Sequence, residues 1–568
     1  MGYFIVIDDI WDVSLWEKIQ YSLVENNLGC KIIITTRNRE VAEKIGSSIY
    51  NMKPLSDEIS GILFYGRIFG SREMCPEEFS VVSTKILKKC GGVPLAICTI
   101  SSLLANKKEN IADWDELCGS IGSGLAKDPS MEGMRKIMSL SYYDLPSHLK
   151  TCLLYLSIFP EDFDIGVDRL ILRWMAEDFI KQVKTGDNLY EIGRGYFNEL
   201  VNRSMIQFSQ ARIGVYSTCR VHDVVLDLIC SLAKEENFVT LSHDIEQNTS
   251  LQSKVRRLSL QKTSGATSCE MSHVRSFTIF SPAIDSMPML SSFHALRVLD
   301  MEDCDLEYHN LRYIGRLVQL RFLGLRGTRY DGELPKDLGK LQFLQALDLR
   351  GTQVKELPAS IMRLKRLMVV RLEENTRLPN GIFRDLTALE ELSGGKFIES
   401  TNFVEELGGL TNLRVLKMDL RAMDQSSRET LDVDALGGLP SLEFLYLSDY
   451  KVATGETLTV KSGMFPRLTM WFSTWTSIVP VFRRGSAPRL RGIEEFDFNM
   501  REMIDAWNGS LDFGLENLGC LERFTAEVDD EEATEQEKEA VVEGLRRARD
   551  THPNGATFDV HMWSGVQF

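Results

Sequence analysis

Hydrophobic and polar residues follow three different patterns along this 568-residue chain. Near the start, two apolar runs rich in β-branched residues, 3–9 and 31–37, are bounded by polar residues and separated by an amphipathic stretch over 14–25. This order predicts a strand, a helix and a second strand, with a third short strand at 48–52. Together these elements predict part of a parallel sheet in an α/β domain.

From 56 to about 125 the apolar positions follow a helical period. The helix predicted over 76–89 stops at the paired glycines Gly91 and Gly92, and Pro94 opens the next helix.

Between 131 and 240 the pattern becomes mixed. Three helices are predicted, within 149–162, 168–180 and 221–233, and strand-like pieces occur within 193–221. We therefore expect a small helical domain with a β-wing.

The second half repeats the pattern L-x-x-L-x-L at steps of 22 to 29 residues. This spacing predicts a leucine-rich-repeat solenoid, in which each unit gives a short parallel strand with its leucines in the core and the residues between them on a concave face. Weaker units begin at 255, 274, 490 and 521, so we expect ten to twelve repeats. The first leucines of the eight clear units are Leu296, Leu320, Leu344, Leu367, Leu389, Leu413, Leu442 and Leu468.

Composition narrows the classes of function. The chain has 65 basic and 81 acidic residues, and its net charge of -16 disfavours a nucleic-acid partner. Its eleven cysteines include no C-x-x-C pair, which argues against a zinc site or a disulfide framework. The apolar stretches are shorter than the roughly 18 residues that span a bilayer, so no membrane span is expected.

Candidate chemistry follows the two N-terminal strands. Asp8 and Asp9 end the first apolar run, as in a Walker B element, where one acid holds Mg²⁺ and the second orients or deprotonates a water. Arg37 ends the next run and could reach a terminal phosphate. Considered alone, Asp8 and Asp9 could equally be acids that cap a loop, and Arg37 could equally be a solvated arginine on the surface.

Five motifs precede the repeats in a fixed order. They are YFIVIDDIWD, GCKIIITTRNREVA, CGGVPLAI, CLLYLSIFPEDFDI and VHDVV. This order resembles the plant nucleotide-binding leucine-rich-repeat (NLR) disease-resistance proteins over nearly the whole chain. The resemblance implies a multidomain α/β fold in the cytoplasm. Its domains would be part of a P-loop STAND ATPase (NB-ARC) sheet at 1–55, a helical domain at 56–130, a winged helix at 131–240 and the solenoid at 241–568.

The same resemblance implies a nucleotide site. Asp8 corresponds to the Mg²⁺ acid, Asp8 and Asp9 to the catalytic acids, and Arg37 to the sensor of the terminal phosphate. Within the segment that corresponds to the GLPL motif, the site would use Gly92, Pro94 and Leu95, with the proline against adenine; the same proline also suits plain helix initiation.

His222 resembles the histidine of the MHD motif, which contacts the ADP diphosphate, with Val221 in place of methionine. A histidine at the start of a helix is also commonly solvated.

No G-x-x-x-x-G-K-[ST] phosphate loop occurs in the sequence. By the resemblance, that loop and an N-terminal signalling domain would precede the first strand, so we expect an N-terminally truncated chain whose sheet exposes apolar edges. ADP, ATP and Mg²⁺ are the cofactors that the family implies, and we expect this chain to bind them weakly or not at all. Whether it is an enzyme stays open.

The resemblance implies an immune receptor. ADP would hold it closed, and perception of a pathogen effector or a guarded host protein by the solenoid would favour ATP and defence signalling, with other NLR chains as further partners. Two alternatives remain: a nucleotide-independent decoy or regulator, and an incomplete gene model. DNA binding through the 168–180 helix is disfavoured, because Arg169 and Arg173 are outnumbered there by acidic residues.

Exposed strand positions of the solenoid give a candidate partner surface. Arg326 and Arg350 occupy equivalent places in successive repeats, so a basic spot is expected for an acidic partner or for an acidic surface of the protein itself. A solvated repeat face is the alternative. The full set of candidate residues is Arg321, Arg326, Arg350 and Arg371, with the aromatic residues Phe322, Phe444 and Tyr446.

Overall fold

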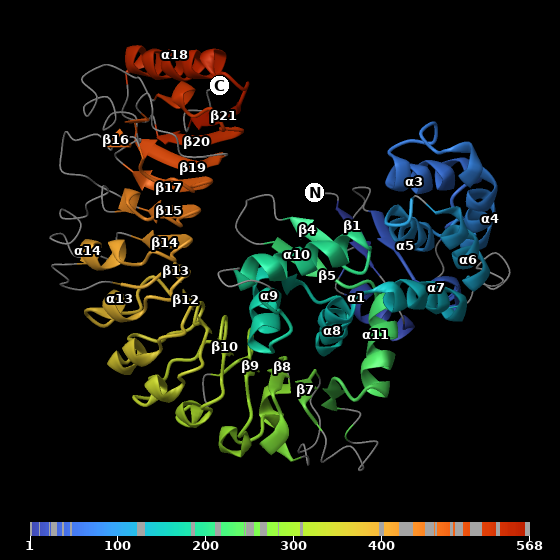
Figure 1. The fold of residues 1–568 in the computed structure, drawn as a ribbon, viewed down its shortest axis with the longest axis horizontal. Coiled ribbons are helices and arrows are strands. Elements are labelled where there is room, and N and C mark those ends of the chain that lie inside the picture. Colours follow the sequence, from blue (N-terminus) through green and yellow to red (C-terminus); the bar gives the residue numbers. More distant parts are fainter. Residues whose placement is uncertain are drawn as a thin grey trace. The chain divides into compact units, whose positions relative to one another are not determined.

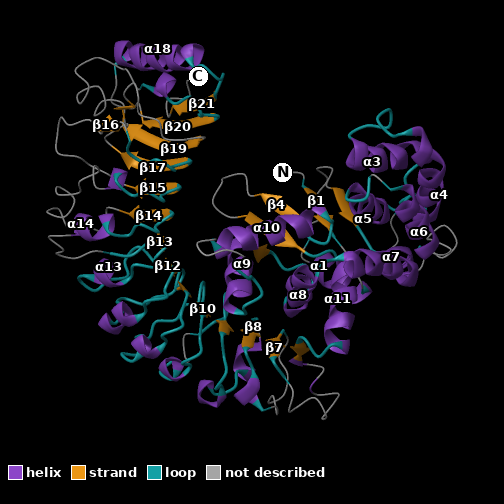
Figure 2. Ribbon diagram, viewed as in Figure 1, coloured by secondary structure: helices purple, strands orange, loops and turns teal. Residues whose placement is uncertain are grey.

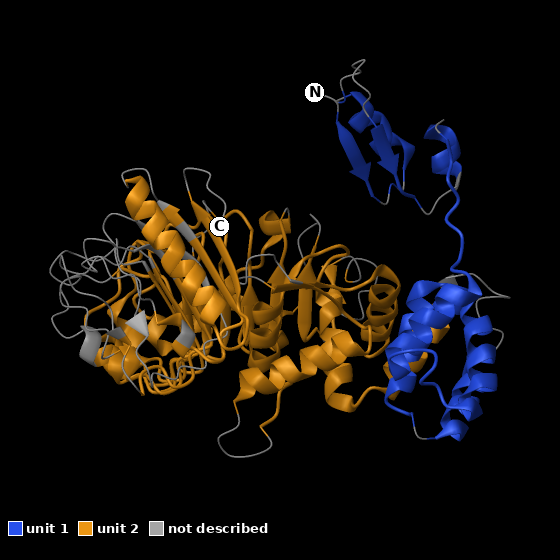
Figure 3. Cartoon of the chain, turned by 90° about the horizontal axis from the view of Figure 1, so that it is seen from above, with its two compact units in different colours: residues 1–134 blue, residues 135–568 orange. Residues whose placement is uncertain are grey.

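The computed structural model divides into two compact units, 1–134 and 135–568, shown in different colours in Figure 3. Each unit is described by itself. The structure describes all residues except 1–2, 9, 11, 22, 24–30, 37–38, 46–47, 109, 122–130, 183–187, 211–216, 243–244, 246–254, 262–269, 282, 307–310, 397–402, 420–435, 449–458, 461–462, 477–480, 483–491, 500–513, 530–533 and 563–568.

The first unit begins with two parallel strands, β1 (Phe4–Ile7) and β2 (Lys31–Ile34), paired in register from Phe4 opposite Lys31 to Ile7 opposite Ile34. Helix α1 (Val13–Tyr21) lies between them in sequence, and α2 (Arg39–Ile45) follows. Apolar side chains at alternate positions of β1, Phe4 and Val6, are exposed.

The predicted third strand at 48–52 is wrong. This segment has no regular secondary structure and pairs with no strand in the part of the chain that the structure describes. Tyr50 and Met52 are 82% and 85% exposed, so the apolar side chains that indicated a strand have no core to pack into. Extended backbone without a neighbouring strand gains no ladder of hydrogen bonds.

The rest of the first unit is a helical bundle, seen in purple in Figure 2. Its aromatic core includes Phe64, Phe79 and Trp114. As predicted, one helix ends at the paired glycines, where Gly91 adopts the left-handed conformation with φ 62°. The helices are α3 (Asp57–Phe69), α4 (Ser80–Cys90), α5 (Pro94–Ala105) and α6 (Ile111–Ser120), with a 3-10 turn at Glu77–Phe79.

The second unit opens with the winged-helix region, whose wing is a three-stranded antiparallel sheet in the order β3, β5, β4. The three predicted helices are present, but two further helices, α7 and α10, were not predicted. The strands are β3 (Ile165–Gly166), β4 (Gln207–Gln210) and β5 (Ser217–Arg220), and the helices are α7 (Met131–Asp144), α8 (Ser147–Tyr155), α9 (Val167–Ala176), α10 (Leu189–Asn202) and α11 (Asp223–Glu235).

The solenoid is built on one 14-stranded parallel sheet, running from β6 in green to β21 in red in Figure 1. Each predicted unit contains a strand of this sheet, and all eight repeat leucines are fully buried. The strands are β6 (Thr240–Leu241), β7 (Arg257–Leu260), β8 (Ser276–Ile279), β9 (Val298–Asp300), β10 (Phe322–Gly324), β11 (Ala346–Asp348), β12 (Val369–Arg371), β13 (Glu391–Ser393), β14 (Val415–Asp419), β15 (Phe444–Ser448), β17 (Met470–Thr476), β19 (Gly492–Asn499), β20 (Arg523–Asp529) and β21 (Thr557–Met562).

Short helical turns connect these strands. Near the C-terminus, α18 (Glu535–Thr551) packs Val541 and Leu545 into the core, and a capping box between Thr534 and Glu537 fixes its start. The remaining elements are the 3-10 turns Leu156–Ile158, Met271–His273, Ala283–Ser286, Leu290–Ser292, Ile314–Arg316, Leu338–Lys340, Ala359–Arg363 and Leu515–Asn517, the helices α13 (Ile382–Asp385) and α14 (Phe403–Gly408), and the paired strands β16 (Thr459–Val460) and β18 (Val481–Phe482).

Candidate functional site

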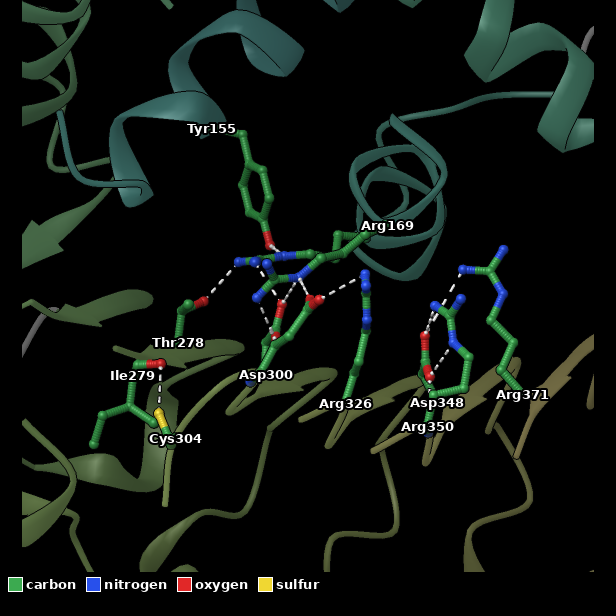
Figure 4. Close-up of polar contacts among 12 residues, drawn as sticks. Tyr155, Arg169, Thr278, Ile279, Asp300, Cys304, Arg326, Asp348, Arg350 and Arg371 are labelled. Carbon is green, nitrogen blue, oxygen red and sulfur yellow. Dashed lines mark hydrogen bonds and ion pairs between the residues drawn. The ribbon is translucent and has the colours of Figure 1, made fainter. Parts of the chain in front are cut away.

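Helix α9 of the winged helix docks on the strands of the solenoid through a buried ion-pair cluster (Figure 4). Asp300, at the end of β9, accepts hydrogen bonds from Nε and Nη2 of Arg169 at 2.9 and 2.8 Å. It also accepts one from Nη1 of Arg173 at 2.6 Å. The side chains of Arg173 and Asp300 are both 0% exposed. The cluster therefore joins residues about 130 positions apart in a site without access to bulk water.

Further polar groups surround Arg173. Its Nε donates to the hydroxyl of Tyr155 at 3.0 Å and its Nη2 to Oγ1 of Thr278 at 2.6 Å. The guanidinium also lies over the rings of Tyr155 and Phe159. Burial alone would raise the pKa of Asp300, but the two guanidiniums hold this pKa below its ordinary value. The carboxylate is thus kept ionised inside the interface.

The C-terminal end of α9 makes a second set of contacts with opposite polarity. Asp178 adopts a left-handed conformation with φ 63° and accepts hydrogen bonds from Arg297, at 2.8 Å, and from Arg321. The adjacent Glu177 is buried and accepts from Nη2 of Arg257 at 3.0 Å. Asp tolerates the left-handed region better than most residues, so the helix can end here with its carboxylate on the solenoid.

A third set of contacts comes from α10. Glu191 accepts a hydrogen bond from Nη2 of Arg414 at 2.5 Å, and Nδ2 of Asn188 donates to Glu390 at 3.2 Å. On the solenoid, Arg371 forms two 2.7 Å hydrogen bonds with Glu391. The winged helix therefore meets the solenoid through three sets of charge-matched contacts, besides neutral hydrogen bonds such as those from Ser259 and Gln261 to the carbonyl of Ile158.

Arginines of the predicted basic spot all have carboxylate partners within the second unit. Arg321 bonds to Asp178 of the winged helix, and Arg371 lies 3.6 Å from Asp168 of the same region. Arg326 and Arg350 bond within the solenoid, to Glu302 and to Asp348 respectively. Two of the four arginines thus contact an acidic surface of the protein itself, as one of the sequence hypotheses proposed.

The three predicted aromatic residues differ in exposure. Phe322 is buried, whereas Phe444 and Tyr446 are partly exposed on β15. Phe444 stacks on Phe472 with ring centroids 4.9 Å apart, and Lys417 lies over its ring at the same distance.

Beside Phe444, a cavity of about 280 Å³ lies between α10 and the solenoid. Its lining combines charged groups of both signs with an aromatic edge, which suits a polar protein partner better than an apolar ligand. The lining residues are Asp168, Tyr190, Glu191, Arg194, Val369, Glu390, Glu391, Arg414, Val415, Lys417, Glu443, Phe444 and Thr469.

The predicted nucleotide-site residues of the first unit fall into two groups. Asp8 follows β1 and accepts a hydrogen bond from the hydroxyl of Thr35, which follows β2, so the carboxyl ends of the two strands carry neighbouring polar groups. Asp9 and Arg37 lie outside the described residues.

The second group lies at the start of α5. Pro94 is the first residue of this helix and is exposed, while Leu95 is half-buried. Gly92 has φ +72°, and a Cβ there would lie 2.5 Å from the carbonyl oxygen of Leu55. The Leu55 N–H donates to the Gly92 carbonyl at 2.8 Å, so glycine is required for this close backbone contact.

His222 belongs to the second unit. It is the N-cap of α11, where its Nδ1 accepts from the Val224 N–H at 3.4 Å. Across the described residues, no group of three or more side chains is placed to hold a metal ion. With Asp8 already bonded to Thr35 and no phosphate-loop motif in the sequence, the residues present do not by themselves make a site for a nucleoside phosphate with Mg²⁺.

Comparison with known families supports the same order of domains. An NB-ARC domain model matches 2–67, a disease-resistance-protein winged-helix model matches 158–229, and a leucine-rich-repeat region model matches 273–432 and 428–558. The chain belongs to the plant NB-ARC leucine-rich-repeat disease-resistance family. The predicted resemblance and the predicted multidomain α/β fold are thereby confirmed. The NB-ARC assignment implies nucleotide binding for the family in general.

Several plant disease-resistance proteins are similar to this family member. Disease resistance protein Pik-2 of Oryza sativa subsp. japonica is 35% identical over 548 residues, which cover 84% of this chain and 53% of that protein. Disease resistance protein RGA5 of the same plant is 32% identical, with 84% and 43% covered. A putative RPP13-like protein of Arabidopsis thaliana is 30% identical, with 78% and 56% covered. The chain thus spans about half the length of these relatives.

A solved leucine-rich-repeat protein of Leptospira interrogans aligns at 18% identity with a TM-score of 0.34, covering 54% of this chain and 72% of its own. This likeness is too low to add to the assignment. Within the described ranges, no helix is long and apolar enough to cross a bilayer.

The sequence pointed to Arg321 and Arg371 on the solenoid side of the docking interface, but it did not identify the buried cluster at its centre. Arg169 and Arg173 were considered only as candidate DNA contacts, yet both are buried against Asp300. One signal was available. Two arginines four positions apart lie on one face of a helix that is apolar apart from them and Asp168, and such a face favours a buried acidic partner. Nothing in the sequence pattern pointed to Asp300 as that partner.

Proposed function

We propose that this protein acts in plant innate immunity as a cytoplasmic NLR-type receptor chain, with the solenoid as its perceiving surface. The observation that carries this proposal is the charge-matched docking of the winged helix on the solenoid. Because of this docking, a partner that binds the solenoid can affect the winged-helix region. In the family, that region belongs to the part of the protein that responds to nucleotide. In the family, effector perception would then favour ATP over ADP and lead to a hypersensitive response.

The partner surface that we favour is the part of the solenoid near β15. There Phe444 and Tyr446 are partly exposed beside the charged cavity, whereas Phe322 is buried. Partly exposed aromatic residues with charged neighbours are typical of protein interfaces. A pathogen effector or a guarded host protein is the expected partner.

Co-expression in leaves tests this proposal. The full chain is paired with individual effectors of one pathogen, and both cell death and co-purification are scored. We expect one effector, or one host protein modified by it, to co-purify with the chain, and Phe444→Glu or Tyr446→Glu to abolish the association. The matched control is Lys538→Glu on α18, far along the sequence from β15. Equal loss in the control, or no partner at all, would contradict this assignment of the surface.

We further propose that this chain by itself binds ADP, ATP and Mg²⁺ weakly, because the backbone amides of a phosphate loop supply most of the contacts to the phosphates in P-loop folds. Titration of the purified chain with a fluorescent ATP analogue tests this. Submicromolar binding that Asp8→Asn abolishes would overturn it.

A second candidate function is a nucleotide-independent regulator that binds other NLR chains. The bond that Asp8, the expected Mg²⁺ acid, forms with Thr35 favours a function without nucleotide. Co-expression with a complete NLR separates the two candidates: a regulator changes the response of that NLR in the absence of any effector, whereas a receptor chain responds only when the effector is present.

A further inference from the structure

Four arginines form a ladder across the first repeats of the solenoid. Arg256, Arg275, Arg297 and Arg321 each lie at the start of a repeat strand, one in each of four successive repeats. The N–H of each of the last three donates to the carbonyl of the preceding arginine, at 2.7, 2.7 and 2.8 Å. The four residues are therefore structural equivalents, and successive rungs are about 4.8 Å apart, as neighbouring strands are.

The two ends of this ladder differ in their partners. Arg297 and Arg321 share the carboxylate of Asp178. Arg256 and Arg275 are exposed, and neither forms an ion pair with any residue that the structure describes. One carboxylate thus bridges the two arginines at one end of the ladder, while the two at the other end, the unbridged pair, have no such bridge.

The local charge is strongly positive although the chain as a whole is acidic. Partial burial and then the charges of Arg297 and Arg256 lower the pKa of Arg275, and Glu177 offsets this only in part. Arg257 adds a fifth guanidinium beside Arg256, which Glu177 neutralises. The five arginines of this region are therefore balanced by only two of the carboxylates named here, Glu177 and Asp178. Such repulsion is relieved when an anion binds between the unbridged guanidiniums.

We propose that Arg256 and Arg275 form a binding site for a multiply charged phosphate group, either a soluble polyphosphate or the phosphorylated headgroup of a lipid. Asp178 shows that one anion can accept hydrogen bonds from two adjacent rungs. Phosphate suits the unbridged pair because guanidinium groups bind its oxygens in a two-pronged geometry, and several phosphates on one ligand can extend along the ladder. This site is distinct from the partner surface at β15.

The test uses the full chain and three probes. Calorimetry measures the binding of inositol hexakisphosphate and of pyrophosphate, and flotation measures binding to phosphatidylcholine vesicles with and without a phosphatidylinositol bisphosphate. The test variant is Arg256→Gln with Arg275→Gln. The matched control is Arg546→Gln with Arg547→Gln, which removes the same charge from two exposed residues of α18.

We expect saturable binding of inositol hexakisphosphate, and a loss of at least about tenfold in affinity in the test variant, because charge-assisted hydrogen bonds are removed. The control should change the affinity by less than about threefold, as expected for a distant charge under salt screening. Binding only to the phosphoinositide vesicles, with the same loss in the test variant, would identify the source of the phosphate as a lipid.

Equal losses in the two double variants, or no binding to any probe, would overturn the proposal. Co-purification of the immune partner is measured on the same variants. If that association fails in the wild-type chain while the phosphate probes still bind, the proposed receptor function is wrong and the phosphate site stands.

Discussion

Two ion-pair clusters of the winged-helix region show how much burial changes the role of a charge. In the wing, Arg220 bonds to both oxygens of Asp164 at 2.5 and 2.7 Å, but the two side chains are 50% and 51% exposed. In the docking interface, Asp300 has similar distances to its arginines and no exposure. Geometry alone therefore does not distinguish the two clusters. The solvent that surrounds one of them does.

This difference has a physical consequence for docking. Exposed charges keep their hydration when a pair breaks, so the pair contributes little to stability. Buried charges cannot regain water while the interface stays closed, so each depends on its partner. The docking of the winged helix is thus specific for one arrangement, since a shifted arrangement would leave Asp300 or Arg173 buried without compensation.

The largest effect is expected when Asp300 is replaced. Asp300→Ala leaves two arginines buried without their shared carboxylate, and we expect the free energy of unfolding of the second unit to fall by about 3–5 kcal/mol. Urea unfolding of the full chain, followed by tryptophan fluorescence, measures this because Trp174 lies buried in α9.

A triple variant separates charge from packing. With Asp300→Leu, Arg169→Met and Arg173→Met together, the two arginines and their shared carboxylate are removed at once. Glu302, which also pairs with Arg169, keeps Arg326 as its partner, so most of the lost stability should return. If the triple variant is as unstable as Asp300→Ala, the interface depends on the shape of these side chains and the comparison of buried with exposed charges fails.

The second-largest effect is expected when the pH is lowered and the buried cluster is protonated. The pKa of Asp300 is lowered on folding, so the stability that its ionised form contributes is fully present above its ordinary value of 3.8 and is lost as the pH falls through the depressed pKa. Burial raises the pKa of the neighbouring Glu302, so its contribution has the opposite sign and is lost as the pH rises above 4.5. We expect Asp300→Asn to remove the acid-side loss of stability, measured as unfolding midpoints below pH 4.

The α10 contact should matter less, because it is only partly buried. Arg414→Gln removes the bonds to Glu191 and Glu443, and we expect a loss of about 1–2 kcal/mol in the stability of the docked arrangement. Hydrogen exchange of α10 measures this directly. Unchanged protection of α10 would show that the first two contacts suffice to hold the winged helix.

Much of the fold could be predicted because it repeats. A leucine spacing read once applies to every unit, and each predicted unit contains a strand. Helix α10 was missed because Gly193 and Gly195 interrupt its apolar pattern, and the helix is stabilised by packing that the local sequence does not show. In the structure, a Cβ at Gly193 would lie 2.5 Å from the Cδ1 of Ile180 and 2.7 Å from the Cγ2 of Ile171, so a larger residue there would have to displace these side chains.

The docking residues could not be predicted in the same way. Whether Arg173 is a surface charge or a buried one depends on Asp300, which lies 127 positions away in another domain. Hydrophobic periodicity and secondary-structure propensity depend on residues that are close along the chain. They carry no information about which distant carboxylate packs against a helix face. The basic spot shows the same limit, since Arg321 and Arg371 were recognised as a group but their partners Asp178 and Asp168 were not.

The smallest effect is expected at the exposed pair of the wing. Asp164→Ala removes two short hydrogen bonds to Arg220, yet we expect the stability to fall by less than about 1 kcal/mol, because both groups regain full hydration. The neighbouring carboxylate Asp162 also remains to attract the arginine. Raising the salt concentration should reduce even this loss, whereas the loss in Asp300→Ala should persist, since salt screens exposed charges and not buried ones. Urea unfolding of both variants at low and high salt tests the comparison, and equal salt dependence would contradict it.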